Sequence, residues 1–136
     1  MSSEQGFTKE EKAAMRARAK ELKAAEDGET AVQESLAAMS PKDRAVGKRI
    51  HELVKETAPE LVPKTWYGMP AYANRDGKVV VYFRNAGKFK ERYSMLGFNE
   101  AANLDDGAFW PVAYALPELK RSDEPKIRAL IKKAAG

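Results

Sequence analysis

The hydrophobic residues follow helical spacing toward both ends of the chain and alternate in its middle. Val32, Leu36 and Met39 recur at intervals of four and three residues, which is the spacing of one helix face. The segment KVVVYF, residues 78–83, has instead the β-branched, alternating character of a strand. Helices followed by antiparallel strands and a last helix predict an α+β fold, in which an antiparallel sheet of about four to five strands packs against helices on one face.

The first predicted helix forms an N-terminal arm. Thr8 and Glu11 have the spacing of a capping box, and the helix that they start should run to about Ala25. Its apolar residues are mostly alanines, which favour helix but bury little surface, so the arm should pack lightly. We therefore divide the chain into an arm at residues 1–28 and an α+β domain at residues 29–136.

Capping and helix-breaking residues indicate where the other helices begin and end. The segment AEDGET, residues 25–30, should break the arm from a short helix at about residues 30–38. Ser40 can cap the next helix with Pro41 at its first position, and this helix should end near Thr57. The last helix, capped by Ser122 or Asp123, should turn Ile127, Leu130, Ile131 and Ala134 inward.

The strands are predicted from turn signals and alternation. Asp76-Gly77 is typical of a two-residue type I′ hairpin turn, in which both residues have positive φ. Two further strands are expected in residues 91–98 and 108–114, and Pro111 indicates an edge position or a bulge. In the strand after the hairpin turn, Val79, Val81 and Phe83 should face one side, and Lys78, Val80, Tyr82 and Arg84 the other.

The composition suits one small domain without disulfides. The chain has 136 residues, 43% of them apolar and 32% charged. It contains no cysteine, which excludes disulfides, thiolate metal sites and cysteine nucleophiles. No apolar run reaches the roughly 20 residues of a membrane span, and the first twelve residues do not read as a secretory signal. We expect a cytoplasmic protein that makes no membrane contact.

Charge is distributed unevenly. Residues 1–40 hold 6 basic and 8 acidic side chains, whereas residues 41–136 hold 18 basic and 12 acidic ones. A mild basic surplus can attract acidic partners or nucleic acid, or it can serve only solubility. Nucleic-acid domains concentrate more charge on one face, so nucleic acid is an unlikely partner.

The catalytic chemistry that the residues can support is limited. His51 is the only histidine, so a two-histidine metal site cannot form and any triad would need this residue. It lies beside the apolar stripe of its helix, which indicates a structural role. Asp105 and Asp106 are ordinary turn residues. We expect a non-enzymatic protein with no cofactor, no catalytic residues and no metal ligands.

Aromatic residues gather round the step Trp66-Tyr67-Gly68-Met69-Pro70. They can fill a core or line a shallow pocket, since tyrosine and tryptophan carry polar atoms that need partners. We expect Trp66 and Met69 to anchor the sheet against the helices. Tyr67 and Tyr72 should reach a cavity or the surface.

A basic hairpin loop, RNAGKFKERY at residues 84–93, lies close by in the sequence. If the next strand already begins within this loop, the alternation of side chains places Lys88, Lys90 and Arg92 in one outward row and Phe89 on the opposite side. Cations around an exposed aromatic ring suit an anion, a carboxylate ligand or a nucleic-acid backbone, although charged loop tips are also common on soluble proteins. The predicted ligand-binding residues are Tyr67, Tyr72, Tyr82, Lys88, Phe89, Lys90, Arg92 and Trp110.

The segment from Ala58 to Phe98, with LDDGAFWPVAYAL and the last helix, resembles the YdhG-like domain-of-unknown-function family. The similarity covers about residues 40–135. Its most specific elements are the W-x-G-M-P step at residues 66–70 and the strand at residues 79–83. The resemblance implies a compact α+β domain.

Some members of that family have been described as frataxin-like intracellular iron chaperones, so the resemblance makes iron a possible partner. Frataxin-type binding relies on an acidic ridge along the first helix. Here Glu10, Glu11 and Glu21 are interleaved with six basic residues, and no iron ligand is assigned. The alternatives to a small-molecule or anion binder are an iron chaperone or protein-partner module, and a weak nucleic-acid binder.

Overall fold

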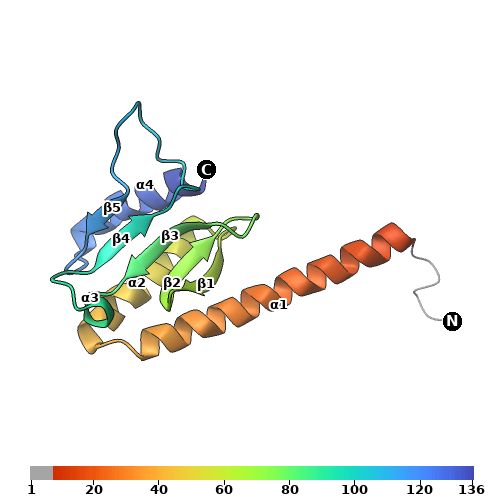
Figure 1. Cartoon of the computed structure of the whole chain (residues 1–136), viewed down its shortest axis with the longest axis horizontal. Helices are drawn as coiled ribbons and strands as arrows, with labels where there is room; N and C mark the ends of the chain where they lie inside the picture. Colours follow the sequence, from red (N-terminus) through yellow and green to blue (C-terminus); the bar gives the residue numbers. More distant parts are fainter. Residues whose placement is uncertain (1–7) are drawn as a thin grey trace.

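A five-stranded antiparallel sheet in the order β1-β2-β3-β4-β5 forms the centre of the computed structural model, which describes residues 8–136 (Figure 1). The strands are β1 (Val62–Trp66), β2 (Met69–Ala73), β3 (Val79–Arg84), β4 (Met95–Phe98) and β5 (Ala113–Ala115). The helices are α1 (Lys9–Ala37), α2 (Pro41–Thr57), α3 (Ala86–Phe89) and α4 (Glu124–Ala135), with a 3-10 turn, η2, at Arg121–Asp123. The predicted α+β fold is confirmed.

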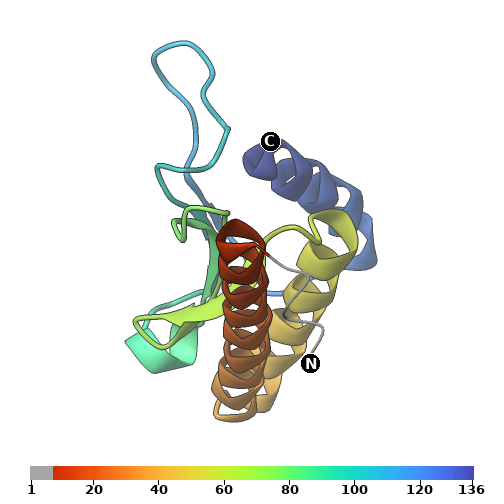
Figure 2. The ribbon, with the colours of Figure 1, turned by 90° about the vertical axis from the view of Figure 1, so that its right-hand side faces the viewer.

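Helices α2 and α4 lie on one side of the sheet (Figure 2). Ser40 caps α2 by accepting from the Asp43 amide, and Pro41 occupies the first turn, as predicted. Arg49 of α2 and Glu124 of α4 form an ion pair 2.7 Å long that ties the two helices together. The core between sheet and helices is apolar, with its largest fully buried side chains at Tyr72, Phe83, Leu36, Ile50, Leu53, Leu96 and Ile131. None of the described helices is long and apolar enough to cross a membrane.

Helix α1 is continuous over 29 residues, so the predicted break at residues 25–30 is wrong. The predicted capping box of Thr8 and Glu11 is present at its start. Gly28 sits inside the helix because a Cβ there would overlap the carbonyl oxygen of Pro63 in β1. Glycine therefore marks close helix–strand contact rather than a helix end. The predicted domain boundary at residue 28 falls within this helix.

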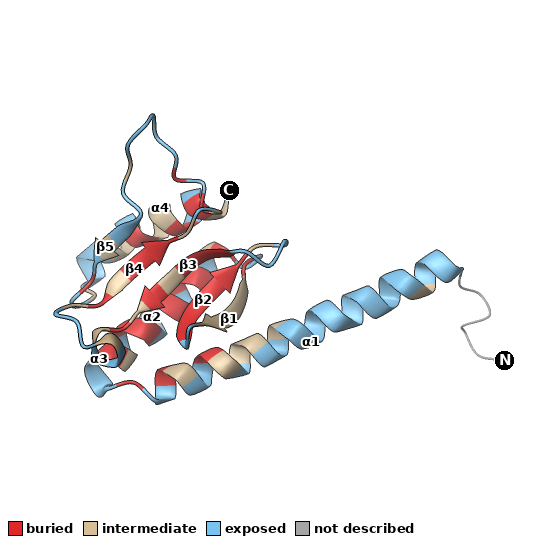
Figure 3. Ribbon diagram, viewed as in Figure 1, coloured by how far each residue is buried: buried red, intermediate tan, exposed pale blue. Residues whose placement is uncertain are grey.

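The outer half of α1 projects away from the sheet, and most of it is exposed (Figure 3). The inner half packs on β1 and β2 and buries Val32 and Leu36. Two sizeable apolar side chains of the outer half, Met15 and Leu22, are about half exposed. One helix thus serves as a projecting arm at its start and as part of the core at its end.

The type I′ turn lies at Tyr67-Gly68 rather than at Asp76-Gly77. Tyr67 has φ 50° and Gly68 φ 75°, and the flanking Trp66 and Met69 are paired across the hairpin. In the second hairpin only Gly77 has positive φ, so the type I′ prediction there is wrong. The Asn74 side chain accepts from the amides of Asp76 and Lys78, which stabilises a longer loop.

Register decides which face each strand residue occupies. The predicted division of Val81 and Phe83 from Tyr82 and Arg84 is confirmed, because Val81 and Phe83 are fully buried in the core while the other two are partly buried. The register shifts between Tyr72 and Ala73, where one extra residue of β3 bulges. That extra residue, Val80, joins the core, contrary to its predicted side.

The segments after β3 are less regular than predicted. Residues 86–89 form the one-turn helix α3, and Lys90 follows with φ 54°, so no strand alternation orders the cations there. Strand β5 begins only at Ala113, two residues after Pro111, and is an edge strand. A long loop at residues 99–112 therefore carries Trp110, which was predicted in a strand.

Candidate ligand-binding face

The sheet face turned away from α2 and α4 is not covered by any described helix (Figures 1 and 2). Trp66 of β1 and Tyr82 of β3 pack on each other there, with ring centroids 5.2 Å apart. The Tyr82 ring lies over Gly97 of β4, where a Cβ would overlap it. The small residues Gly97 and Ala71, the cross-strand partners of Tyr82, thus let the ring lie close to the sheet.

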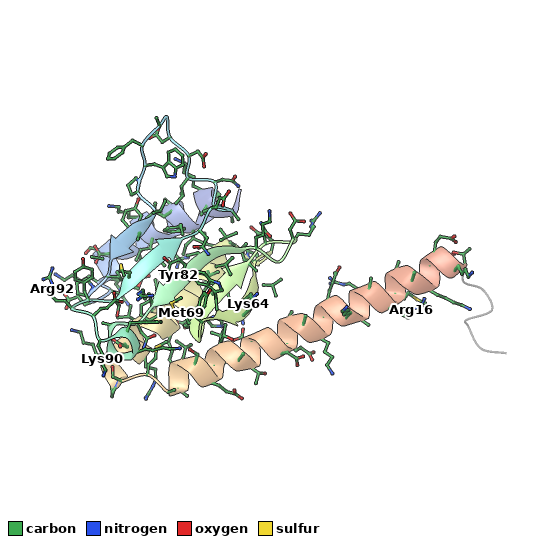
Figure 4. All side chains as sticks on the ribbon, viewed as in Figure 1. Arg16, Lys64, Met69, Tyr82, Lys90 and Arg92 are labelled. Atoms are coloured by element: carbon green, nitrogen blue, oxygen red, sulfur yellow. The ribbon has the colours of Figure 1, made fainter. Side chains whose placement is uncertain are left out.

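Met69 lies beneath this aromatic layer and is 2% exposed. Figure 4 shows Met69 and Tyr82 close together on the sheet. Met69 pairs with Trp66 across the hairpin, so the two side chains share the uncovered face. The prediction that Trp66 and Met69 anchor the sheet against the helices is wrong, because the tight turn at Tyr67-Gly68 sets the opposite parity.

Basic side chains border one end of the aromatic layer. The guanidinium carbon of Arg84 stands 3.9 Å from the centre of the Phe89 ring, and Lys88 Nζ lies 5.5 Å from the same centre. Lys88 Nζ donates to the carbonyl oxygen of Tyr67 at 2.8 Å. The Tyr67 ring in turn packs on Trp66 at 5.0 Å. This aromatic–basic rim joins α3 to the β1–β2 turn.

A shallow hollow of about 730 Å³ opens beside Trp66 on the other side of the layer. Its charged lining is mixed, with Lys64 and Lys78 opposing Asp76 and Glu100. The face therefore has a basic end at the rim and a mixed end at the hollow.

The structure brings together four of the predicted site residues: Tyr67, Tyr82, Lys88 and Phe89 belong to the aromatic layer or its rim. Tyr67 is 76% exposed, as predicted. Lys90 and Arg92 are exposed near α3 (Figure 4), where Arg92 stands 4.9 Å from the centre of the Tyr93 ring.

Tyr72 and Trp110 lie elsewhere. Tyr72 is fully buried among the helix-facing residues, so the prediction that it reaches a cavity or the surface is wrong. Its cross-strand partner is Val81, which places it on the core side. Trp110 packs against the core from the loop at residues 99–112 and lines a separate hollow of about 320 Å³ beside Phe98 and Leu104.

The Tyr72 hydroxyl belongs to a buried chain of polar groups. It lies 2.8 Å from His51 Nδ1, and His51 Nε2 lies 2.6 Å from a carboxylate oxygen of Glu29. Burial, and to a lesser degree the Glu29 charge, raises the pKa of the Tyr72 hydroxyl well above its ordinary value. His51 is 4% exposed, so it has the structural setting expected for it.

Glu29 is the charged end of this chain. Burial raises the pKa of its carboxyl, but hydrogen bonds from Lys55 and Gln33 and the interaction with His51 outweigh that effect and lower the pKa to about 2. The Lys55 ammonium lies 2.7 Å from Glu29 Oε1. The network connects α1, α2 and β2 behind the sheet.

Several residues of interest were not predicted from the sequence. Trp66 was assigned to the core. Side-chain alternation along β1 would have placed it on the uncovered face only if the tight turn at Tyr67-Gly68 had been recognised. Asp43 and Asn85 are buried polar residues, 7% and 4% exposed. Their pattern in the chain is that of an ordinary helix start and a loop, so no sequence signal marks them.

Within residues 8–136 no group of three or more histidine, aspartate or glutamate side chains is arranged to hold a metal ion. No family model, curated protein or solved structure matches the chain. Any assignment of function therefore depends on the geometry of its own residues.

Proposed function

We propose that the chain is a binding protein for a small anion with a flat apolar part. The observation that carries this proposal is the partly buried Trp66–Tyr82 pair on an uncovered sheet face, bordered by the basic rim. A flat apolar group would stack on the aromatic layer. Its negative charge would meet Arg84 and Lys88.

The basic side of this site has several cationic groups that can bind a ligand. Arg84 Nε donates to Glu91 at 2.6 Å, which leaves its other N–H groups for a ligand. Lys90 and Arg92 are exposed close by, and neither forms an ion pair among the described residues. Charge-assisted hydrogen bonds from such groups suit a carboxylate or a phosphate.

The proposal is binding without a chemical step. His51 is held between Glu29 and Tyr72 behind the sheet, so the imidazole is not presented to the uncovered face. The groups of the aromatic layer and its rim that would meet the ligand are rings, guanidinium and ammonium groups, which bind and orient rather than attack.

The test is a titration with benzoate, salicylate and adenosine monophosphate, with benzamide and acetate as controls that lack the charge or the ring. A Trp110→Phe background makes Trp66 the remaining tryptophan, so its fluorescence reports on this face. We expect saturable quenching by the flat anions and amide shifts confined to β1, β3 and α3. Shifts that avoid these elements would contradict the proposal.

A double variant, Lys88→Gln with Lys90→Gln, should weaken anion binding about tenfold or more for each charged hydrogen bond lost. The matched control is Lys132→Gln with Lys133→Gln, two exposed lysines on α4, the helix behind the sheet. Equal affinities in both variants would remove the rim from the site. An oligonucleotide that binds with steep salt dependence while the small anions do not would favour the nucleic-acid alternative.

A further inference from the structure

A second pocket, of about 490 Å³, lies behind the β1–β2 turn. It forms where the end of α1, the start of α2, the turn at Gly68 and the start of α3 come together, at the lower left of Figure 1. Its lining includes two buried polar side chains, Asp43 and Asn85, and the exposed Lys88. Neither Asp43 nor Asn85 belongs to the aromatic layer or its rim.

Asp43 is a buried carboxylate, and the groups of residues 8–136 that donate hydrogen bonds to it are neutral. Its Oδ2 accepts from the Gly87 amide at 3.0 Å, and its Oδ1 lies 3.5 Å from the Ser94 hydroxyl. Among residues 8–136 no cationic nitrogen lies within 4.0 Å of it. A buried charge is normally matched by an opposite charge, so Asp43 can accept a cationic partner from a ligand.

Asn85 is the second buried polar residue of the lining. It precedes α3 at the capping position, but its side chain makes no capping hydrogen bond, because Asp43 takes the Gly87 amide. In the described part of the chain its buried Oδ1 has no hydrogen-bond partner. That oxygen is fully enclosed, so a ligand in the pocket meets the remainder of the Asn85 side chain rather than Oδ1.

The rest of the lining determines what kind of ligand the pocket can bind. Met39 and Ala38 supply apolar surface, and the Lys88 ammonium is held over the turn by the Tyr67 carbonyl. A simple cation would be repelled by Lys88. A molecule with an ammonium group at one end and a carboxylate at the other satisfies both sides.

We propose that this pocket binds a small aliphatic amino acid in its zwitterionic form. The ammonium group donates to Asp43, the aliphatic part rests on Met39, and the carboxylate meets Lys88. This function goes beyond the binding of flat anions, since its acceptor Asp43 lies outside the uncovered sheet face, whereas Lys88 is common to the pocket and the rim.

The experiment is a titration of the ¹⁵N-labelled full chain with glycine, alanine and γ-aminobutyrate. Propylamine has only the ammonium group and propionate only the carboxylate, so both serve as controls. We expect saturable shifts of the Gly87 backbone amide and the Asn85 side-chain amide with at least one zwitterion, and about tenfold weaker binding of both half-molecules.

Asp43→Asn removes the charge and keeps an oxygen for the Gly87 amide, so it should reduce affinity for the zwitterion at least about tenfold. The matched control, Asp106→Asn in an exposed turn, should bind like the parent. The titration of the parent chain decides the matter even if the Asp43 variant does not fold. Absence of saturable shifts at Gly87 and Asn85, or shifts only at Trp66 and Tyr82, would overturn the proposal.

Discussion

Gly28 of α1 and Pro63 of β1 meet backbone to backbone, so that a Cβ on Gly28 would overlap the Pro63 carbonyl oxygen. This contact explains why a poor helix former sits within a 29-residue helix. The glycine allows α1 to approach the edge of the sheet more closely than any other residue would.

Gly28→Ala should therefore destabilise the protein although alanine favours helix. Overpacking at such a contact costs about 1–3 kcal/mol, against about 1 kcal/mol gained from helix propensity. Urea denaturation measures the difference. Thr30→Ala, at an exposed position two residues on, supplies the propensity gain alone and should be neutral or stabilising. A Gly28→Ala protein as stable as the parent would show that α1 moves away without loss.

The sequence predicted which segments are helix or strand better than where they touch. Helical periodicity on both sides of Gly28 is present in the sequence, but glycine in AEDGET was interpreted as a break, because the strand carbonyl that requires it is 35 residues away. The α+β class and the start of α2 followed from local signals such as Ser40-Pro41, which act within one turn of helix.

The candidate site was predicted only in part, because facing depends on turn geometry. Tyr67 with positive φ is unusual for a bulky residue, and without it the parity of β1 and β2 could not be assigned. Tyr72 was consequently assigned to the pocket although it lies in the core. The prediction that cations of the loop lie around Phe89 did not depend on turn geometry, because these residues are adjacent to Phe89 in the sequence.

Tyr72→Phe should destabilise the protein by about 1–3 kcal/mol, since it leaves Nδ1 of the buried His51 without its partner. The free energy of unfolding in urea is the measurement. Tyr67→Phe removes the same hydroxyl from a side chain that is 76% exposed, and should change stability little. Equal effects of the two changes would mean that the His51–Tyr72 contact contributes nothing.

Glu29 should make the free energy of unfolding depend on pH in the acidic range. Its pKa is lowered to about 2 in the folded protein, so its contribution is complete above the ordinary value of 4.5 and is lost as the pH falls toward 2. Glu29→Gln should be less stable than the parent at pH 6, and the difference should shrink between pH 4.5 and pH 2. Urea midpoints across this range provide the measurement. Glu26→Gln, exposed on the same helix, should follow the parent throughout, and a Glu29 variant that does the same would contradict the assignment.

Removal of residues 1–24 should leave the domain folded, because the described part of that segment is almost entirely exposed. Amide spectra of the truncated chain should superimpose on those of the parent from residue 40 onward. Removal of residues 1–36 deletes Val32 and Leu36, both 0% exposed, and should abolish the dispersed spectrum. Collapse in the shorter deletion would show that the outer half of α1 stabilises the body.

Gly97 and Tyr82 offer a test of the aromatic layer itself. A Cβ at residue 97 would overlap the Tyr82 ring, so Gly97→Ala should force the ring off the sheet and destabilise the protein by about 1–3 kcal/mol. Tyr82→Ala alone removes the ring and its contact with Trp66. In the double variant the ring is absent, the Cβ has room, and alanine no longer clashes. The two changes should therefore be less destabilising together than the sum of the single effects, which a double-mutant cycle in urea measures directly. Additive effects would mean that Tyr82 does not lie over Gly97 in solution, and the flat surface proposed for the ligand would then be absent.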